Sequence, residues 1–321
     1  ATNIVINNTR PLTICEQIEI RNTSSNRINE PGQLYRGARS LQSIPFVPWI
    51  RNDASRDHVF AFYACNKLKF LPDEFASQDK FWFKNMTRLR NCFDSCFNLQ
   101  YLPEGLFGDS EQSNMNDAYR AFIHCYKLRR IPYLGIRTGS GEDTTIQGIF
   151  YNCRRLTKIP KGLSFQRVNS NGLQNMFYEN RELKDFSSIF DGITDAFANI
   201  NASTVRIDGL FRGLTQLLEF PFVGQFTKAN EVNSLFYDCR NVRSFSPLYT
   251  HLDFTSATKM SNTFQNMECL EELPEIKVRS LTSSNSTHQT FNQCRRLKSV
   301  KITGMIAGAS NGNYFRMFNN C

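Results

Sequence analysis

The stretch FYNCRRLTKIP, at residues 150–160, contains the pattern that recurs along this 321-residue chain. Its skeleton is Phe150, then Cys153, Leu156 and Ile159 at steps of three, and a closing Pro160. The skeleton occurs eleven times, complete or degenerate, at steps of 25 to 34 residues, and we number each repeat from its aromatic residue as position 0. The sequence therefore predicts a repeat protein. The aromatics are Tyr35, Phe62, Phe93, Phe122, Phe150, Phe177, Phe211, Phe236, Phe264, Phe291 and Phe318.

The pattern within each repeat predicts an α/β solenoid. Apolar residues lie at positions −4, −1, 0 and +3, as in Ile146, Ile149, Phe150 and Cys153, and this spacing predicts a short helix. The segment from the Leu to the Pro predicts a short strand or an extended segment. Because helices need more lateral room than strands, we expect a curved leucine-rich-repeat stack of about ten turns.

The period also predicts the domain organisation. Each repeat needs only its neighbours to bury its apolar side, so we interpret residues 35–321 as one solenoid domain. No polar capping turn covers the last repeat, and we expect the stack to continue beyond residue 321. Residues 1–34 fall outside the period, and we interpret them as an N-terminal cap or the end of a preceding region.

Phe at position 0 and Cys at position +3 are expected to fill the core. Seven of the ten cysteines occupy position +3. We interpret them as buried free thiols that act as small apolar side chains, although stacked cysteines could reach disulfide range if the turns are close. The expected core residues are Phe62, Cys65, Phe93, Cys96, Phe122, Cys125, Phe150, Cys153, Phe236, Cys239, Phe291 and Cys294.

The skeleton, with preceding segments such as MSNTF (260–264), VNSLF (232–236) and LQNMF (173–177), resembles the BspA-like leucine-rich repeats of bacterial surface proteins. The variant most similar to it occurs in mycoplasma surface lipoproteins and in phage tail or virion proteins. The resemblance covers residues 35–321. It implies a leucine-rich-repeat fold with surface display, adhesion or ligand binding, and it implies neither chemistry nor functional residues.

The residues that carry chemistry form no recognisable site. The four histidines, His58, His124, His251 and His288, have no partner at metal-binding spacing, and no Cys-x-x-Cys pair is present. Motifs for a nucleophilic serine, a phosphate-binding glycine loop or a zinc protease are also missing from the sequence. We therefore predict no metal, no cofactor, no catalytic residue and no enzymatic activity.

The clearest binding signal is basic. The formal net charge is +9, and Lys or Arg recurs between the Cys and the Ile of several repeats, where stacking would align the residues into a stripe. Glu182, Glu219, Glu268, Glu271 and Glu272 interrupt this stripe. Its alternative explanation is a solvated surface that only keeps the turns soluble. The candidate binding residues are Lys127, Arg129, Arg130, Arg154, Arg155, Lys158, Arg240, Arg243, Arg295, Arg296 and Lys298, together with Lys67 and Lys69.

These observations lead to two functional hypotheses. The first is a non-enzymatic recognition or adhesion module on an extracellular surface or a virion, which binds a protein or an acidic glycan. The second is an architectural phage tail or capsid-associated protein that packs against copies of itself or other virion proteins. Nucleic acid is a weaker candidate, because aromatics recur in the core rather than beside the basic positions. No stretch approaches 18 uninterrupted apolar residues, so we predict no membrane span.

Overall fold

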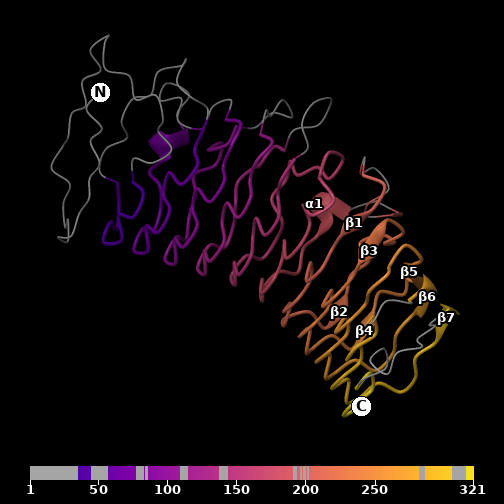
Figure 1. Cartoon of the computed structure of the whole chain (residues 1–321). Helices are drawn as coiled ribbons and strands as arrows, with labels where there is room; N and C mark the ends of the chain where they lie inside the picture. Colours follow the sequence, from indigo (N-terminus) through magenta and orange to yellow (C-terminus); the bar gives the residue numbers. More distant parts are fainter. Residues whose placement is uncertain are drawn as a thin grey trace, which may run out of the picture. The chain divides into compact units, whose positions relative to one another are not determined.

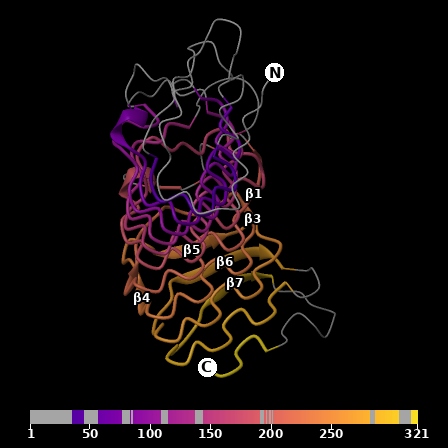
Figure 2. The same ribbon diagram turned by 90° about the vertical axis from the view of Figure 1, so that its left-hand side faces the viewer.

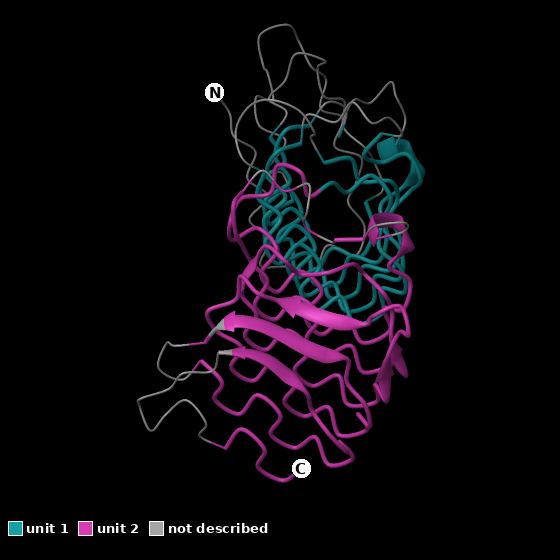
Figure 3. Cartoon of the chain, turned by 90° about the vertical axis from the view of Figure 1, so that its right-hand side faces the viewer, with its two compact units in different colours: residues 1–164 teal, residues 165–321 magenta. Residues whose placement is uncertain are grey.

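The structure is a computed structural model (Figure 1, Figure 2). It describes residues 35–44, 57–76, 83, 86–108, 115–136, 144–190, 194–195, 197, 200, 202–281, 286–305 and 316–321. The chain divides into two compact units, residues 1–164 and 165–321, which we call unit 1 and unit 2 (Figure 3). The predicted N-terminal region, residues 1–34, lies outside the described residues.

Each repeat contains a series of tight turns where the sequence predicted a helix. In the repeat of Phe122, the amides of Ile123 and Cys125 donate to carbonyls three residues back in the chain, at 3.3 and 3.1 Å. The amides of Phe122 and His124, which alternate with them, donate to carbonyls of the following repeat, both at 2.9 Å. An α-helix would direct every amide to the carbonyl four residues back. The predicted helix in each repeat, and with it the predicted α/β class of the solenoid, is therefore wrong.

Helical segments in the described part of the chain are short and do not recur with the period. They are η2 (Asp73–Ala76), a single 3-10 turn, and α1 (Ser187–Phe190), which has four residues. The predicted curvature depends on a helix in every repeat, and the described repeats do not contain one.

Left-handed backbone explains why the chain turns instead of coiling. The residues at positions −2 and +2 of the described repeats have φ between 51° and 77°. Asn, Gly or Asp fills eleven of these 21 positions, as at Asn91, Gly148 and Asp238. These residue types adopt the left-handed region at the lowest cost, whereas a right-handed helix cannot pass through such a residue.

The turn series places the same side chains inward that a helix face would. In the repeat of Phe122, positions −4, −1, 0 and +3 are Ala118, Ala121, Phe122 and Cys125, and all four are fully buried. This coincidence is why the apolar spacing indicated a helix. The spacing fixes which positions are buried, and the backbone between them takes a different form.

A ladder of phenylalanine rings forms the core of each unit. In unit 1, Phe62 stacks on Phe93 with ring centroids 5.2 Å apart and an interplanar angle of 3°. In unit 2, Phe264 stacks on Phe291 at 5.2 Å and 2°. The twelve expected core residues are each fully buried. Burial of a large ring in every repeat makes this ladder the main apolar contribution to folding.

The cysteines at position +3 also share one polar contact. Each thiol donates to the carbonyl of the aromatic at position 0 of the preceding repeat, with Sγ to oxygen distances of 2.9 to 3.1 Å. A thiol is small and apolar enough for the core and still satisfies a buried carbonyl. These residues are Cys65, Cys96, Cys125, Cys153, Cys239, Cys294 and Cys321.

The named strands of the described residues all lie in unit 2 and all pair in parallel. Each strand pairs with its counterpart in a later repeat, so Leu252 lies opposite Ile276, which lies opposite Ile302 (Figure 2). In unit 1, isolated parallel bridges take their place, such as Phe70 with Tyr101. The pairs are β1 (Val205–Arg206) with β3 (Ala229–Glu231), β2 (Glu219–Phe220) with β4 (Ser244–Phe245), and β5 (His251–Phe254) with β6 (Glu275–Ser280) and β7 (Ile302–Met305).

Candidate binding surface

Residues at position +7 are joined from repeat to repeat by backbone hydrogen bonds. The amide of Lys69 donates to the carbonyl of Gln42 at 3.2 Å, and the amide of Gln100 donates to the carbonyl of Lys69 at 2.8 Å. The amide of Thr157 likewise donates to the carbonyl of Arg129 at 3.3 Å. Equivalent positions therefore lie one above another, at the spacing of about 4.8 Å that separates paired strands. Side chains at +4, +5, +7 and +8 form columns along each unit.

In unit 1 the four columns of the repeats of Phe62, Phe93, Phe122 and Phe150 define what we call the basic–aromatic patch. Its sixteen positions hold eight Lys or Arg and four aromatic residues, with no Asp or Glu. The side chains of Phe70 and Tyr101 are 44% and 42% exposed, which is unusual for aromatic rings that a repeat could bury. The four rows are Asn66, Lys67, Lys69 and Phe70; Phe97, Asn98, Gln100 and Tyr101; Tyr126, Lys127, Arg129 and Arg130; and Arg154, Arg155, Thr157 and Lys158.

Local contacts order part of the patch. The guanidinium of Arg154 lies 4.7 Å from the centroid of the Tyr126 ring, which stacks on Phe97 at 5.1 Å. The Lys127 ammonium donates to Oδ1 of Asn98 at 2.6 Å. These contacts hold cations in place without neutralising them, because their partners are uncharged.

Few acidic side chains offset the charge of the patch. Arg130 pairs with Glu104 at 2.8 Å, but both side chains are more than half exposed, so the pair is worth little. Four further cations make no ion pair within the described residues and are exposed to solvent. These are Lys67, Lys69, Arg129 and Lys158.

The candidate basic residues of unit 2 are placed differently. Arg240 pairs with Asp238 at 2.8 Å, and this carboxylate raises the pKa of the guanidinium. Arg295 lies 3.8 Å from Glu268, and Lys298 lies 3.2 Å from Glu271. The equivalent columns of unit 2 hold six Asp or Glu, seven Lys or Arg and no aromatic residue. The candidate residues therefore form a basic surface in unit 1 and a mixed one in unit 2.

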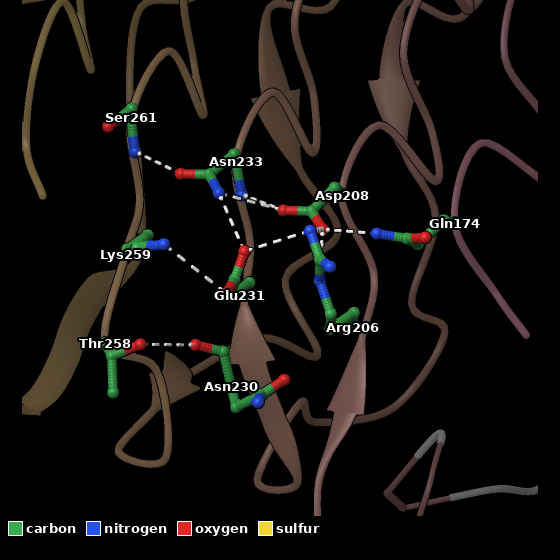
Figure 4. Close-up of polar contacts among 9 residues, drawn as sticks. All are labelled: Gln174, Arg206, Asp208, Asn230, Glu231, Asn233, Thr258, Lys259 and Ser261. Atoms are coloured by element: carbon green, nitrogen blue, oxygen red, sulfur yellow. Dashed lines mark hydrogen bonds and ion pairs between the residues drawn. The ribbon is translucent and has the colours of Figure 1, made fainter. Parts of the chain in front are cut away.

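A second polar cluster, in unit 2, lies at positions −5 and −3 on the other side of the turn series (Figure 4). Glu231 lies between Arg206 at 3.1 Å and Lys259 at 3.5 Å. Asp208 accepts from Gln174 and from the Asn233 side chain, both at 2.9 Å. The charges alternate in sign from repeat to repeat and satisfy one another, so this ladder stabilises the register of the stack rather than binding a ligand.

Unit 1 repeats the arrangement of the charge ladder. Arg88 lies 2.9 Å from Asp57 and 3.6 Å from Asp117, which belong to the neighbouring repeats. Neither charge ladder was predicted from the sequence, although Asp57, Arg88 and Asp117 alternate in sign at position −5.

The thiols and histidines give no sign of a reactive site. Burial raises the pKa of the Cys65, Cys239 and Cys294 thiols to about 12, so they stay protonated at neutral pH and are poor nucleophiles. His58 stacks on Phe83 with centroids 4.7 Å apart, and burial lowers the pKa of His124. In the described part of the chain, no group of three or more His, Cys, Asp or Glu is placed to hold a metal ion.

The aromatic members of the patch were missed because the sequence reasoning placed aromatics only in the core. In unit 1 this placement is wrong, since Phe70, Phe97, Tyr101 and Tyr126 lie beside the basic positions. Phe70 and Tyr101 share position +8 in successive repeats, but the later repeats have Arg130 and Lys158 there, so no periodic signal exists.

No protein-family model and no curated protein matches the chain. One similar solved structure is that of a leucine-rich repeat protein from Bacteroides ovatus ATCC 8483. It is 18% identical, with a TM-score of 0.38, and the match covers 89% of this chain and 78% of that one. Among the described residues, no helix has the length and apolar character needed to cross a membrane.

Proposed function

We propose that this repeat protein is a non-enzymatic recognition module that holds an anionic macromolecule on the basic–aromatic patch of unit 1. The observation that carries this proposal is the composition of the patch: eight cations and no carboxylate in sixteen stacked positions. Clustered charge of one sign attracts an oppositely charged partner at long range and raises its local concentration.

The charge distribution along the chain supports the same surface. Residues 1–164 contain 22 Lys or Arg and 15 Asp or Glu, a net charge of +7, whereas residues 165–321 contain 16 and 14, a net charge of +2. Most of the formal charge of +9 therefore belongs to the unit that carries the patch. An anionic partner would meet unit 1 first.

The resemblance of residues 35–321 to BspA-like repeats supports the placement of this module on an exterior surface. In that setting the partner is an acidic glycan or the acidic face of a protein. The protonated, buried thiols agree with binding rather than catalysis, and the absence of enzymatic activity stays a prediction.

Chromatography on immobilised heparin tests the proposal. The unit 1 variant changes Lys67, Lys69, Arg129 and Lys158 to Ser, and the matched control changes Arg240, Arg243, Arg295 and Lys298 to Ser. Both remove four exposed positive charges. We expect the unit 1 variant to elute at clearly lower salt and the control to shift much less, because Arg240, Arg295 and Lys298 already lie beside carboxylates. Equal shifts, or no shift, would contradict the proposal.

A further inference from the structure

One row of the patch carries no charge. This neutral row, Phe97, Asn98, Gln100 and Tyr101, contains two amides and two aromatic rings. The preceding row holds Lys67 and Lys69, and the following row holds Lys127, Arg129 and Arg130. The patch therefore presents a cationic row, then a neutral row, then two cationic rows along the axis of unit 1.

The distance between the two cationic rows follows from the backbone pairing. Phe70 bridges Tyr101 in parallel, and the amide of Gln100 donates to the carbonyl of Lys69 at 2.8 Å. Adjacent rows are thus about 4.8 Å apart, and the cationic rows on either side of the neutral one are about 9.6 Å apart. A linear polymer lying over the first three rows of the patch would match this pattern if it carried a charge on every second unit of its chain.

Two of the four aromatic rings, Phe97 and Tyr126, disfavour a stacked nucleobase. The ring of Tyr126 has Phe97 stacked against it at 5.1 Å with an interplanar angle of 10°, and the guanidinium of Arg154 lies 4.7 Å from its centroid. Single-stranded nucleic acids stack their bases on open aromatic faces and carry a phosphate on every unit. Here the stacked pair is already covered by the guanidinium of Arg154, and the neutral row contributes no cation of its own. Its neighbour Lys127 is held by Oδ1 of Asn98 at 2.6 Å.

The neutral row has the groups that an uncharged sugar needs. Tyr101 is 42% exposed, and its hydroxyl donates to Oδ1 of Asp73 at 3.3 Å, which orders the ring. An exposed ring surface next to Phe70, which is 44% exposed, suits the C–H face of a sugar. The exposed amide of Gln100 can both donate to and accept from hydroxyl or N-acetyl groups.

We infer that the ligand of the patch is an anionic polysaccharide in which a charged sugar alternates with a neutral one. This inference rests on the proposed function and names the ligand class for the same surface. The polysaccharide lies along unit 1, with its neutral sugar on the Phe97–Tyr101 row and its anionic sugars at the rows before and after it.

Isothermal titration calorimetry with two negatively charged polymers tests this inference. Hyaluronan oligosaccharides carry a carboxylate on alternate sugars, whereas polygalacturonate oligosaccharides carry one on every sugar. We expect the full chain to bind hyaluronan more tightly at equal length and ionic strength. The Gln100→Lys variant adds a cation to the neutral row, so it should shift the preference toward polygalacturonate.

A second pair of variants tests the aromatic rings. Phe70→Ala together with Tyr101→Ala should weaken hyaluronan binding about tenfold, because apolar contact area is lost, and should change polygalacturonate binding much less. The matched control is Leu218→Ala with Leu248→Ala, which removes two apolar side chains of unit 2 that are 63% and 70% exposed. The control should bind like the unaltered protein, and thermal melting checks that all variants fold.

The outcomes separate the inference from the proposed function. Binding to both polymers with equal affinity would overturn the alternating-sugar inference and leave an anion-binding module. Tighter binding to polyuridylate than to hyaluronan would overturn it in favour of single-stranded nucleic acid. A chain that binds none of these polymers, heparin included, would overturn both.

Discussion

The two units share an interior and differ in the surface beside it. Unit 1 stacks Phe93 on Phe122 at 5.3 Å, and unit 2 stacks Phe264 on Phe291 at 5.2 Å, both nearly parallel. At positions +4 to +8, however, unit 1 has nine cations without a carboxylate, while unit 2 has seven cations and six carboxylates. The columns that bury side chains are constrained by packing from both neighbours. The exposed columns are free to diverge, so function is to be sought in what the repeats do not share.

The segments outside the turn series differ between the two units as well. Unit 2 closes its repeats with parallel strands, the longest being β6, whereas the described part of unit 1 uses isolated bridges. The turn series is common to both. The turns therefore hold the stack together in either unit, and the strands are an addition in unit 2.

Removal of a stacked phenylalanine ring should have the largest effect on the free energy of unfolding, and the effect should be equal in the two units. Phe122 lies between Phe93 and Phe150, and Phe236 lies between Phe211 and Phe264. Both rings are fully buried, so Phe122→Ala and Phe236→Ala should each lower the free energy of unfolding by about 3 to 5 kcal/mol. Urea unfolding measures the loss. If one unit tolerated the change, the shared interior would not be the basis of both.

Glycine-to-alanine substitutions compare how much room the strands of unit 2 and the turns of unit 1 leave for a side chain. Gly304, in β7, has φ of +128°, and a Cβ there would lie 1.7 Å from the carbonyl oxygen of Val278 in β6. Gly304→Ala should therefore cost about 3 kcal/mol or more. Gly148, in a turn of unit 1, has φ of +60°, and the nearest atom to its Cβ would be Cγ of Arg120 at 3.5 Å.

Gly148→Ala is the matched control, since it adds the strain of a left-handed residue without a backbone clash. Its cost should be about 1 kcal/mol, and urea unfolding compares the two variants. Equal costs would indicate that the β6–β7 pairing shifts to make room for the methyl group.

The buried thiols should make the protein sensitive to alkali, and unit 1 more so. Burial raises the pKa of Cys65 from 9.0 to about 12. The folded state keeps the thiol protonated while the unfolded chain ionises, so the stabilisation is complete below pH 9 and is lost between pH 9 and 12. At pH 10 the loss is about 1.4 kcal/mol per thiol. Five buried cysteines belong to unit 1 and two to unit 2, among the described residues.

The Cys65→Ala variant measures this contribution. The difference in unfolding free energy between the unaltered protein and this variant should be smaller at pH 10 than at pH 7 by about 1.4 kcal/mol. The corresponding difference for Phe122→Ala should not change with pH. A constant difference for Cys65→Ala would show that the thiol is not protected from ionisation.

The sequence predicted the buried columns correctly but not the backbone that joins them. Spacing such as Ala118, Ala121, Phe122 and Cys125 identifies one buried face, and both a helix and a turn series can present it. The distinguishing signal was the choice of residues at positions −2 and +2, where Asn and Gly recur. The periodicity of apolar residues carries no information about left-handed backbone. The helix was therefore predicted from a pattern that a turn series produces equally well.

The candidate site was predictable in its charges and not in its ion pairs. Lys and Arg between the Cys and the Ile are visible in the sequence, as at Lys127 and Arg129. Whether a cation is neutralised depends on a carboxylate one repeat away, as Glu271 is from Lys298. The separation of 27 residues hides such pairs, although the five glutamates that interrupt the stripe in the sequence all lie in unit 2.

The variant with the smallest expected effect distinguishes a turn series from a helix directly, at a turn of unit 2. Gln289, at position −2, has φ of +51°. Gln289→Gly should stabilise the protein by about 0.5 kcal/mol, because relief of the left-handed strain exceeds the entropy that glycine gains in the unfolded chain. Gln289→Ala keeps the strain and should change little. In a helix the glycine would instead cost about 1 kcal/mol, so the sign of the change in urea midpoint discriminates between the two backbones.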